Sequence, residues 1–189
     1  MHHFSAGGLY DGLILLVDDE TRSYWNHVTG EAVHGPLVGE RLATWNLDYT
    51  TAGAALVADP TLSLSRSGRG LVARLMGFMH RRKIGTAGFL PPGFRSTMGA
   101  EDKRLTPMTQ GLGVMFEREQ RFYPVAALTG GAVTEFVGSR QLRVALGEVD
   151  RVPRAVWQDD GTSPRQLFTR WYGFSFTFHG CSIHGEPKP

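Results

Sequence analysis

Short apolar segments separated by turns rich in glycine, proline and aspartate dominate the chain. Runs of four to eight residues that are β-branched, aromatic or alternately polar and apolar are typical of strands. The segments with this pattern are 12–17, 21–27, 41–49, 61–64, 112–116, 121–128, 133–137, 141–146 and 155–157. Within 41–49, the side that carries Trp45, Leu47 and Tyr49 is expected to face a core. The hydrophobic pattern therefore predicts many short strands.

Three segments depart from this pattern and predict short helices. Residues 50–58 can be capped by Thr50 or Thr51 and end at Asp59-Pro60. Residues 69–83 carry the strongest helical periodicity. The aromatic segment 167–178 suits either a buried helix or a strand, and we expect a short helix followed by a turn at 179–180.

These elements predict one mainly β domain of the α+β class over residues 1–189. We expect compact antiparallel sheets or a half-barrel with two or three short helices, because a chain of this length folds around one core. A weak echo between residues 50–64 and 170–184 suggests two related halves, 4–66 and 103–185, around an insertion at 67–102. Chance similarity explains this echo equally well.

Composition and charge exclude several classes of protein. The formal net charge of +2 gives no argument for a nucleic-acid partner. No apolar run approaches the roughly 20 residues that span a bilayer. A single cysteine cannot form an internal disulfide. Without a signal peptide at its start the sequence predicts a cytoplasmic protein, or an exported one if a leader was removed. The oligomeric state is not indicated.

Four imidazoles and the only thiol supply the main candidate for a chemical site. His27 and His34 flank a predicted turn, whereas His179 and His184 flank Cys181. Imidazole and thiolate are suitable ligands for zinc, copper or iron, so a metal site forms if the fold brings the two groups together. Packing at a helix end is the simpler explanation of the late group. His2 and His3 directly follow the first methionine and are assigned no role.

Two residues are candidates for catalysis. Cys181 beside an imidazole is a candidate nucleophile, although a buried, inert thiol is the simpler explanation. Glu31 lies between the two early histidines and is a candidate for proton transfer. No recognised hydrolase or phosphate-binding motif is present. The sequence does not decide whether the domain is an enzyme that acts on a small-molecule substrate.

A hypothesis from another class is a non-catalytic module that binds a ligand or a protein. It would use the long loop predicted at 85–103 and the basic end of the preceding helix, residues 80–83. Long irregular loops often lie over a binding site. A solvated helix end is the simpler explanation of the basic cluster.

Several blocks of the sequence resemble one prokaryotic family. Residues 4–10, 16–25, 29–32 and 35–42 form the most specific part of the resemblance, and 102–105, 112–114, 123–128 and 171–179 follow in the same order. These blocks resemble the family catalogued as domain of unknown function 3179. The resemblance implies no established activity. It implies that members often carry a cysteine-containing segment before the first block, together with an export signal.

Overall fold

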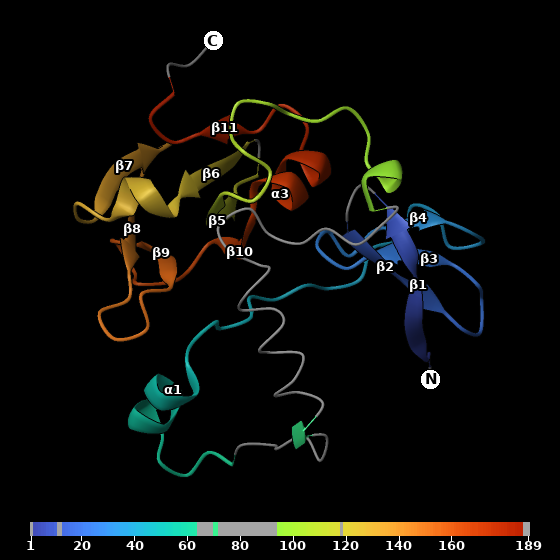
Figure 1. Ribbon diagram of the computed structural model, residues 1–189, viewed down its shortest axis with the longest axis horizontal. Coiled ribbons are helices and arrows are strands. Elements are labelled where there is room, and N and C mark those ends of the chain that lie inside the picture. The colour runs from blue at the N-terminus through green and yellow to red at the C-terminus, as the bar shows by residue number, and fades with distance from the viewer. Residues whose placement is uncertain (1, 11–12, 64–69, 72–93, 118, 187–189) are drawn as a thin grey trace.

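The computed structural model describes residues 2–10, 13–63, 70–71, 94–117 and 119–186. Within these ranges the chain is mostly β, with three open sheets and two α-helices (Figure 1). The N-terminal sheet lies on one side of the molecule, and the other two sheets lie together on the opposite side (Figure 1). This arrangement confirms the predicted mainly β class with short helices.

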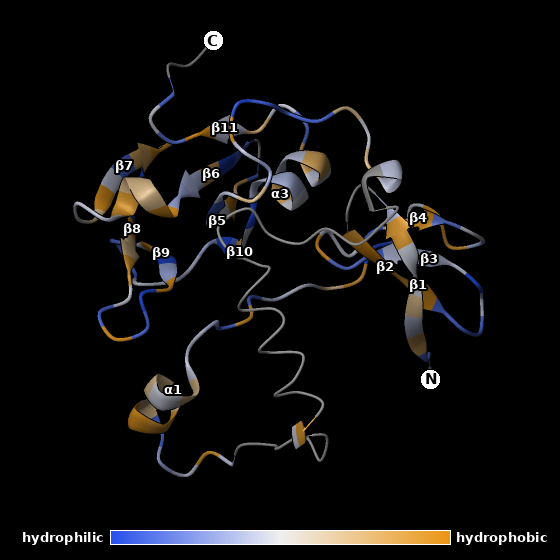
Figure 2. Cartoon of the chain, viewed as in Figure 1, coloured by the Kyte–Doolittle hydropathy of each residue, from blue (hydrophilic) through white to orange (hydrophobic). Residues whose placement is uncertain are grey.

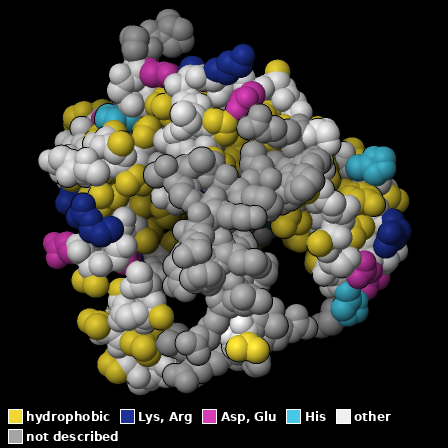
Figure 3. Space-filling view, viewed as in Figure 1, with side chains coloured by type: hydrophobic (Ala, Val, Ile, Leu, Met, Phe, Trp, Pro, Cys, Tyr) yellow, Lys and Arg dark blue, Asp and Glu magenta, His cyan; other side chains and the backbone are white. Residues whose placement is uncertain are grey.

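The N-terminal sheet contains four strands in the order β1-β2-β3-β4. Its strands are β1 (Phe4–Tyr10), β2 (Leu13–Asp18), β3 (Tyr24–Asn26) and β4 (Ala32–His34), and each neighbour pair is antiparallel. Val17, Trp25 and Ala32 are buried in this sheet. The edge strand β1 is almost wholly exposed, and apolar side chains are visible on this side of the molecule in Figure 3.

The second sheet has the order β10-β5-β6-β11. Its strands are β5 (Gln110–Met115), β6 (Gln120–Pro124), β10 (Arg165–Arg170) and β11 (Ser182–Ile183). β5 and β6 form a hairpin, β10 adds antiparallel to β5, and β11 adds parallel to β6. Helix α3 (Trp171–Thr177) directly follows β10.

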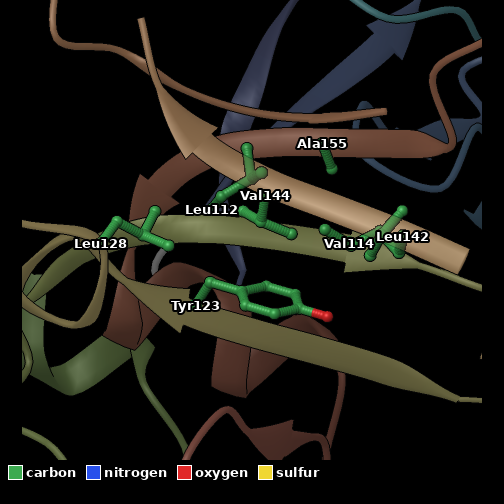
Figure 4. Packing of buried hydrophobic residues seen from close by; sticks show 7 residues of the cluster. All are labelled: Leu112, Val114, Tyr123, Leu128, Leu142, Val144 and Ala155. Atoms are coloured by element: carbon green, nitrogen blue, oxygen red, sulfur yellow. The ribbon is translucent and has the colours of Figure 1, made fainter. Parts of the chain in front are cut away.

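The third sheet is an antiparallel meander of β7 (Val133–Val137), β8 (Arg140–Leu146) and β9 (Pro153–Trp157). The short 3-10 helix η2 (Val125–Leu128) leads from β6 to this sheet. Side chains of the second and third sheets and of η2 meet in one apolar cluster (Figure 4): Leu112, Val114, Tyr123, Leu128, Leu142, Val144 and Ala155.

The opposite face of the second sheet packs on α3. Phe122 points to this face because neighbouring strand residues alternate between the two faces. It forms a second cluster with Trp171, Phe174, Cys181 and Ile183. In Figure 2, hydrophobic colour marks much of the N-terminal sheet, β7 and α1, whereas parts of β6 and β10 are hydrophilic. The second sheet is therefore buried on both faces.

A segment without regular structure connects the N-terminal sheet to the rest of the molecule. The Asn46 side chain donates a hydrogen bond to the Pro164 carbonyl and accepts one from the Gln166 backbone N–H. Tyr49 stacks edge-on against Phe168. Helix α1 (Ala52–Ala58) follows, and the Thr51 side chain caps it, as predicted. This helix buries none of its residues and stands apart from the sheets (Figure 1).

Several sequence predictions need correction. Residues 41–49 form no strand, and Trp45 is 77% exposed rather than part of a core. Hydrogen bonds to residues in and beside the distant strands β9 and β10 hold this segment in place of strand pairing. Residues 61–63 are not a strand either. The segment 167–178 divides into strand β10 and helix α3. Strand β1 was not predicted, since its glycines and exposed positions give no strong pattern.

Other predictions fall partly outside the described residues. Of the helix predicted at 69–83, residues 69 and 72–83 lie outside the described part of the chain. Of the loop predicted at 85–103, residues 85–93 lie outside it as well, and residues 94–97 form the 3-10 helix η1 (Phe94–Thr97). The predicted relation between two halves stays a prediction.

Candidate functional site

The two early histidines lie on the N-terminal sheet, and each has its own local partner. His27 follows β3, and its Nδ1 lies 2.7 Å from the Ile14 carbonyl oxygen. His34 ends β4, and its ring packs against Tyr24 with the ring centres 5.8 Å apart. Both histidines are exposed.

The late group lies together around β11. His179, Cys181 and His184 line one pocket of about 590 Å³, here called the C-terminal pocket. Its other lining residues are Arg104, Glu119, Gln120, Arg121, Glu135, Gly180, Ser182, Ile183, Gly185 and Glu186. The structure thus brings the three late residues to one site. His27 and His34 are not among its lining residues.

The turn after α3 places the late group in this pocket. Gly180 has a φ of +74°, a left-handed conformation that glycine adopts without steric cost. The chain then pairs Ser182 with Arg121 in the parallel β11–β6 ladder, and the His184 N–H donates to the Phe122 carbonyl at 2.8 Å. Strand pairing therefore sets the position of His184 beside the side chains of β6.

A buried ionic network forms the floor of the C-terminal pocket. The Arg121 guanidinium is 8% exposed and donates to Glu135 Oε2 at 2.6 Å and to a Glu119 carboxylate oxygen. Its Nε also donates to Ser182 Oγ at 3.2 Å. The Tyr123 hydroxyl donates to the second oxygen of Glu135. A buried cation is tolerated when carboxylates pair with it in this way.

Burial and these partners change the ionisation of the network. Burial would lower the pKa of Arg121, but Glu135 raises it above its ordinary value. Burial and the hydrogen bond to Glu135 raise the pKa of Tyr123 far above the usual range. The guanidinium therefore stays charged and the phenol stays neutral at all physiological pH values.

His184 completes the network from the pocket side. Its ring stacks on Tyr123 with the ring centres 5.3 Å apart and the planes tilted by 21°. Its Nδ1 lies 3.9 Å from Glu135 Oε1, which is ion-pair distance when the ring is protonated. His179 lies on the pocket rim, and its Nδ1 is 3.1 Å from the Ser175 carbonyl oxygen.

Cys181 is buried, with 3% of its surface exposed. Burial raises the pKa of its thiol to about 11, against an ordinary value of 9.0. The thiol is consequently neutral at pH 7, whereas the thiolate is the nucleophilic form. The environment of Cys181 in the free protein is that of a packed core residue.

Glu31 lies in a different, larger hollow between the N-terminal sheet and the rest of the molecule. This groove has a volume of about 1070 Å³ and is lined by Glu31, Arg41, Trp157 and Arg165, among others. Glu31 pairs with Arg41 at 3.3 Å, and both side chains are largely exposed. Glu119 and Gln120 line both hollows, so the groove and the C-terminal pocket are neighbours. The proton-transfer role of Glu31 stays a prediction.

A shared metal ion needs ligand atoms that converge. Among the described residues, no group of three or more histidine, cysteine, aspartate or glutamate side chains with converging ligand atoms includes His27, His34, His179, Cys181 or His184. The metal-binding role of these five residues therefore stays a prediction. It requires side-chain rearrangement on binding.

Sequence reasoning missed Arg104, Arg121, Tyr123 and Glu135. A signal for Arg121 was present, because a charged residue in the apolar strand segment 121–128 must either face solvent or find a partner. Its partner Glu135 lies on another strand, and no local pattern connects the two.

The fold and the pocket define a mainly β domain with an open site of mixed charge between sheet edges. In the described part of the chain, no helix has the length and apolar character needed to cross a bilayer.

The sequence profile of the family described as "Protein of unknown function (DUF3179)" matches residues 3–186, and the chain belongs to this family. No curated protein and no solved structure matches the chain.

Proposed function

We propose that this domain binds a cation in the C-terminal pocket, either a divalent transition-metal ion or a small organic ammonium or guanidinium group. The observation that carries this proposal is the charge of the lining. Among the described lining residues, three carboxylates, those of Glu119, Glu135 and Glu186, outnumber the two guanidinium groups of Arg104 and Arg121. A concave site with excess negative charge attracts cations.

The two guanidinium groups of the pocket are already engaged. Arg104 donates to both oxygens of Asp102, to Glu186 and to the Cys181 carbonyl. Arg121 is engaged by Glu135, Glu119 and Ser182. The same ion pairs engage Glu119, Glu135 and Glu186, so the described lining keeps an excess of one negative charge. This excess favours a positively charged ligand.

The imidazoles of the pocket supply neutral acceptors. A carbonyl oxygen only accepts hydrogen bonds, so the contact to Ser175 places the proton of a neutral His179 on Nδ1. The Nε2 lone pair is then free to bind a metal ion or to accept from an ammonium group. Histidine ligands of metal ions are commonly oriented by such a bond from the other ring nitrogen. Cys181 would join a metal site only by losing its proton.

Calorimetric titration of protein purified without a metal-affinity tag tests the proposal. Zinc chloride and spermidine are the two probes, and they separate a metal ion from an organic cation. His179→Ala should weaken zinc binding by about tenfold or more, since even supporting residues of metal sites have effects of this size. Glu186→Gln should weaken either cation.

The matched control is Glu148→Gln, which removes an exposed carboxylate that does not line the pocket. Its binding should equal that of the wild type. Absence of binding by both probes, or equal binding by all variants, would refute the proposal.

A further inference from the structure

A second cluster of ligand-type side chains lies at the opposite end of the molecule from the C-terminal pocket. Among the described residues, His2, Asp18 and Glu20 each offer one ligand atom, and these three atoms lie within 4.8 Å of one another. Figure 3 shows histidine and acidic side chains together at the edge of the molecule where Figure 1 places the N-terminus.

Strand register brings these residues together. In the antiparallel β1–β2 pair, Phe4 lies opposite Asp18. The Asp19 N–H donates to the His3 carbonyl at 2.9 Å and extends the ladder past the strand ends. The residues that precede β1 therefore lie beside the turn that follows β2, and this position is fixed by main-chain hydrogen bonds.

One separation in the cluster, between His2 and Asp18, is slightly shorter than one ion requires, and all three ligand atoms lie within 4.8 Å of one another. His2 Nδ1 lies 2.9 Å from Asp18 Oδ2. His3 Nδ1 lies 2.5 Å from Glu20 Oε1. Two ligand atoms about 2 Å from one tetrahedral zinc ion lie roughly 3.3 Å apart. Small side-chain movements would place an ion between His2, Asp18 and Glu20, with His3 beside Glu20 as a further imidazole.

Asp18 is held in place for such a role by groups outside the ligand set. It is fully buried, yet its carboxylate accepts from the Thr21 hydroxyl at 2.7 Å and from the Glu20 N–H at 3.0 Å. Thr21 Oγ1 is in turn 2.9 Å from Ser23 Oγ, and Ser23 is fully buried. Supporting hydrogen bonds of this kind orient the carboxylate ligands of metal ions. His2 is exposed and Glu20 is 39% exposed, so an ion can reach the cluster from solvent.

The charge of the turn also suits a cation. Asp18, Asp19 and Glu20 are three successive carboxylates. Among the described residues, the guanidinium that pairs with Asp19 is that of Arg22, at 3.8 Å. Imidazole nitrogen combined with carboxylate oxygen is a ligand set for zinc and related divalent ions, whereas calcium prefers oxygen alone.

We propose that His2, Asp18 and Glu20 form a binding site for a divalent transition-metal ion. This site is independent of the proposed function of the C-terminal pocket.

Zinc titration of full-length, tag-free protein tests the site with two variants of exposed ligands. Glu20→Gln and His2→Ala should each weaken zinc binding at this site by about tenfold or more. Asp19→Asn removes a neighbouring exposed carboxylate outside the ligand set and should bind zinc as the wild type does. Zinc should raise the unfolding temperature of the wild type and of Asp19→Asn more than that of the other two variants.

The variant His179→Ala distinguishes zinc binding in the C-terminal pocket from zinc binding at this site. That variant should keep the zinc affinity that Glu20→Gln loses, and a double variant should lose both contributions. Wild-type zinc affinity in both Glu20→Gln and His2→Ala would overturn the proposal, because His2 precedes the strands and its replacement leaves the folded sheets intact. Absence of any zinc binding would overturn it as well.

Discussion

Gly113 lies on β5 directly under the ring of Phe174 from helix α3. A Cβ atom at this position would lie 2.0 Å from Phe174 Cε2 and 2.2 Å from Cδ2. Such separations are far shorter than van der Waals contact, and both residues are buried. The missing side chain therefore allows the helix to pack against the sheet. The same close approach brings α3 and the turn that follows it to the edge of the C-terminal pocket.

We predict that Gly113→Ala destabilises the protein by about 1–3 kcal/mol, because the added methyl group overpacks the core. Gly130→Ala is the matched control, since a Cβ there has open space around it. The control should change stability by less than about 0.5 kcal/mol. Urea denaturation measures both variants, and equal midpoints for the two would contradict the argument.

Cys181 gives a pH-dependent contribution to stability. The unfolded thiol ionises near pH 9.0, whereas burial raises the folded pKa to about 11. The folded state then holds its proton at pH values where the unfolded state has lost it. This contribution is complete below pH 9 and falls as pH rises from 9 toward 11.

We expect the wild type to lose about 2 kcal/mol more stability than Cys181→Ala between pH 7.5 and pH 10.5. Urea unfolding at the two pH values measures this difference. The alanine variant controls for tyrosine and lysine ionisation, which affects both proteins. Parallel losses in the two proteins would show that the thiol is not buried as described.

At the scale of elements, one ion network connects two sheets. Arg121 on β6 of the second sheet binds Glu135 on β7 of the third. Tyr123, two residues after Arg121, donates to the same carboxylate. A strand that points Arg121 and Tyr123 to one face thus makes two bonds to a single partner.

We predict that Glu135→Gln lowers the free energy of unfolding by about 1–3 kcal/mol, because it weakens charge-assisted bonds in a partly buried site. Glu31→Gln breaks the exposed pair with Arg41 and serves as the control, with an expected loss of less than about 1 kcal/mol. Thermal unfolding of both variants at the same ionic strength provides the measurement. A larger loss in the control would contradict this ranking.

At the scale of the whole molecule, polar contacts in the described part of the chain help to hold the N-terminal sheet against the other two sheets. Asn46 bonds to the main chain on both sides of Arg165. Arg165 in turn donates to the Val28 carbonyl at 3.1 Å. The same docking encloses the groove that holds Glu31.

We expect Asn46→Ala to increase hydrogen exchange in β2 and β3 more than in β5 and β8, since it removes two hydrogen bonds worth about 1 kcal/mol each. Trp45→Ala is the control on the same segment, because that side chain is largely exposed. Uniform protection loss across all sheets would show that the molecule unfolds as one cooperative unit.

Local signals in the sequence explain which elements were predicted. The meander 133–157 was anticipated closely, because each strand alternates and each turn carries glycine or charged residues. Helix α1 was anticipated from its threonine cap and terminal proline. In contrast, 41–49 alternates like a strand, but its exposed backbone is held by Asn46 and by Arg154, which donates to the Tyr49 carbonyl. Contacts between residues more than a hundred positions apart leave no local pattern.

The candidate site also has one part that the sequence predicts and another that only contacts between distant segments bring together. His179, Cys181 and His184 are close in sequence, and one turn with β11 brings them to a common pocket. Glu135, Arg121 and Arg104 complete that pocket from separate segments, and only strand pairing and sheet packing bring them there. His2 reaches Asp18 through the β1–β2 register, which no spacing between those residues indicates.

The sequence by itself determined the mainly β class, the family, most strands of the C-terminal part and the late histidine–cysteine group, because these depend on neighbouring residues. The tertiary structure alone decided which charges are buried, which ligand atoms converge and where the two hollows lie. Those properties depend on distances between residues far apart in the chain, and the packing of whole sheets sets these distances.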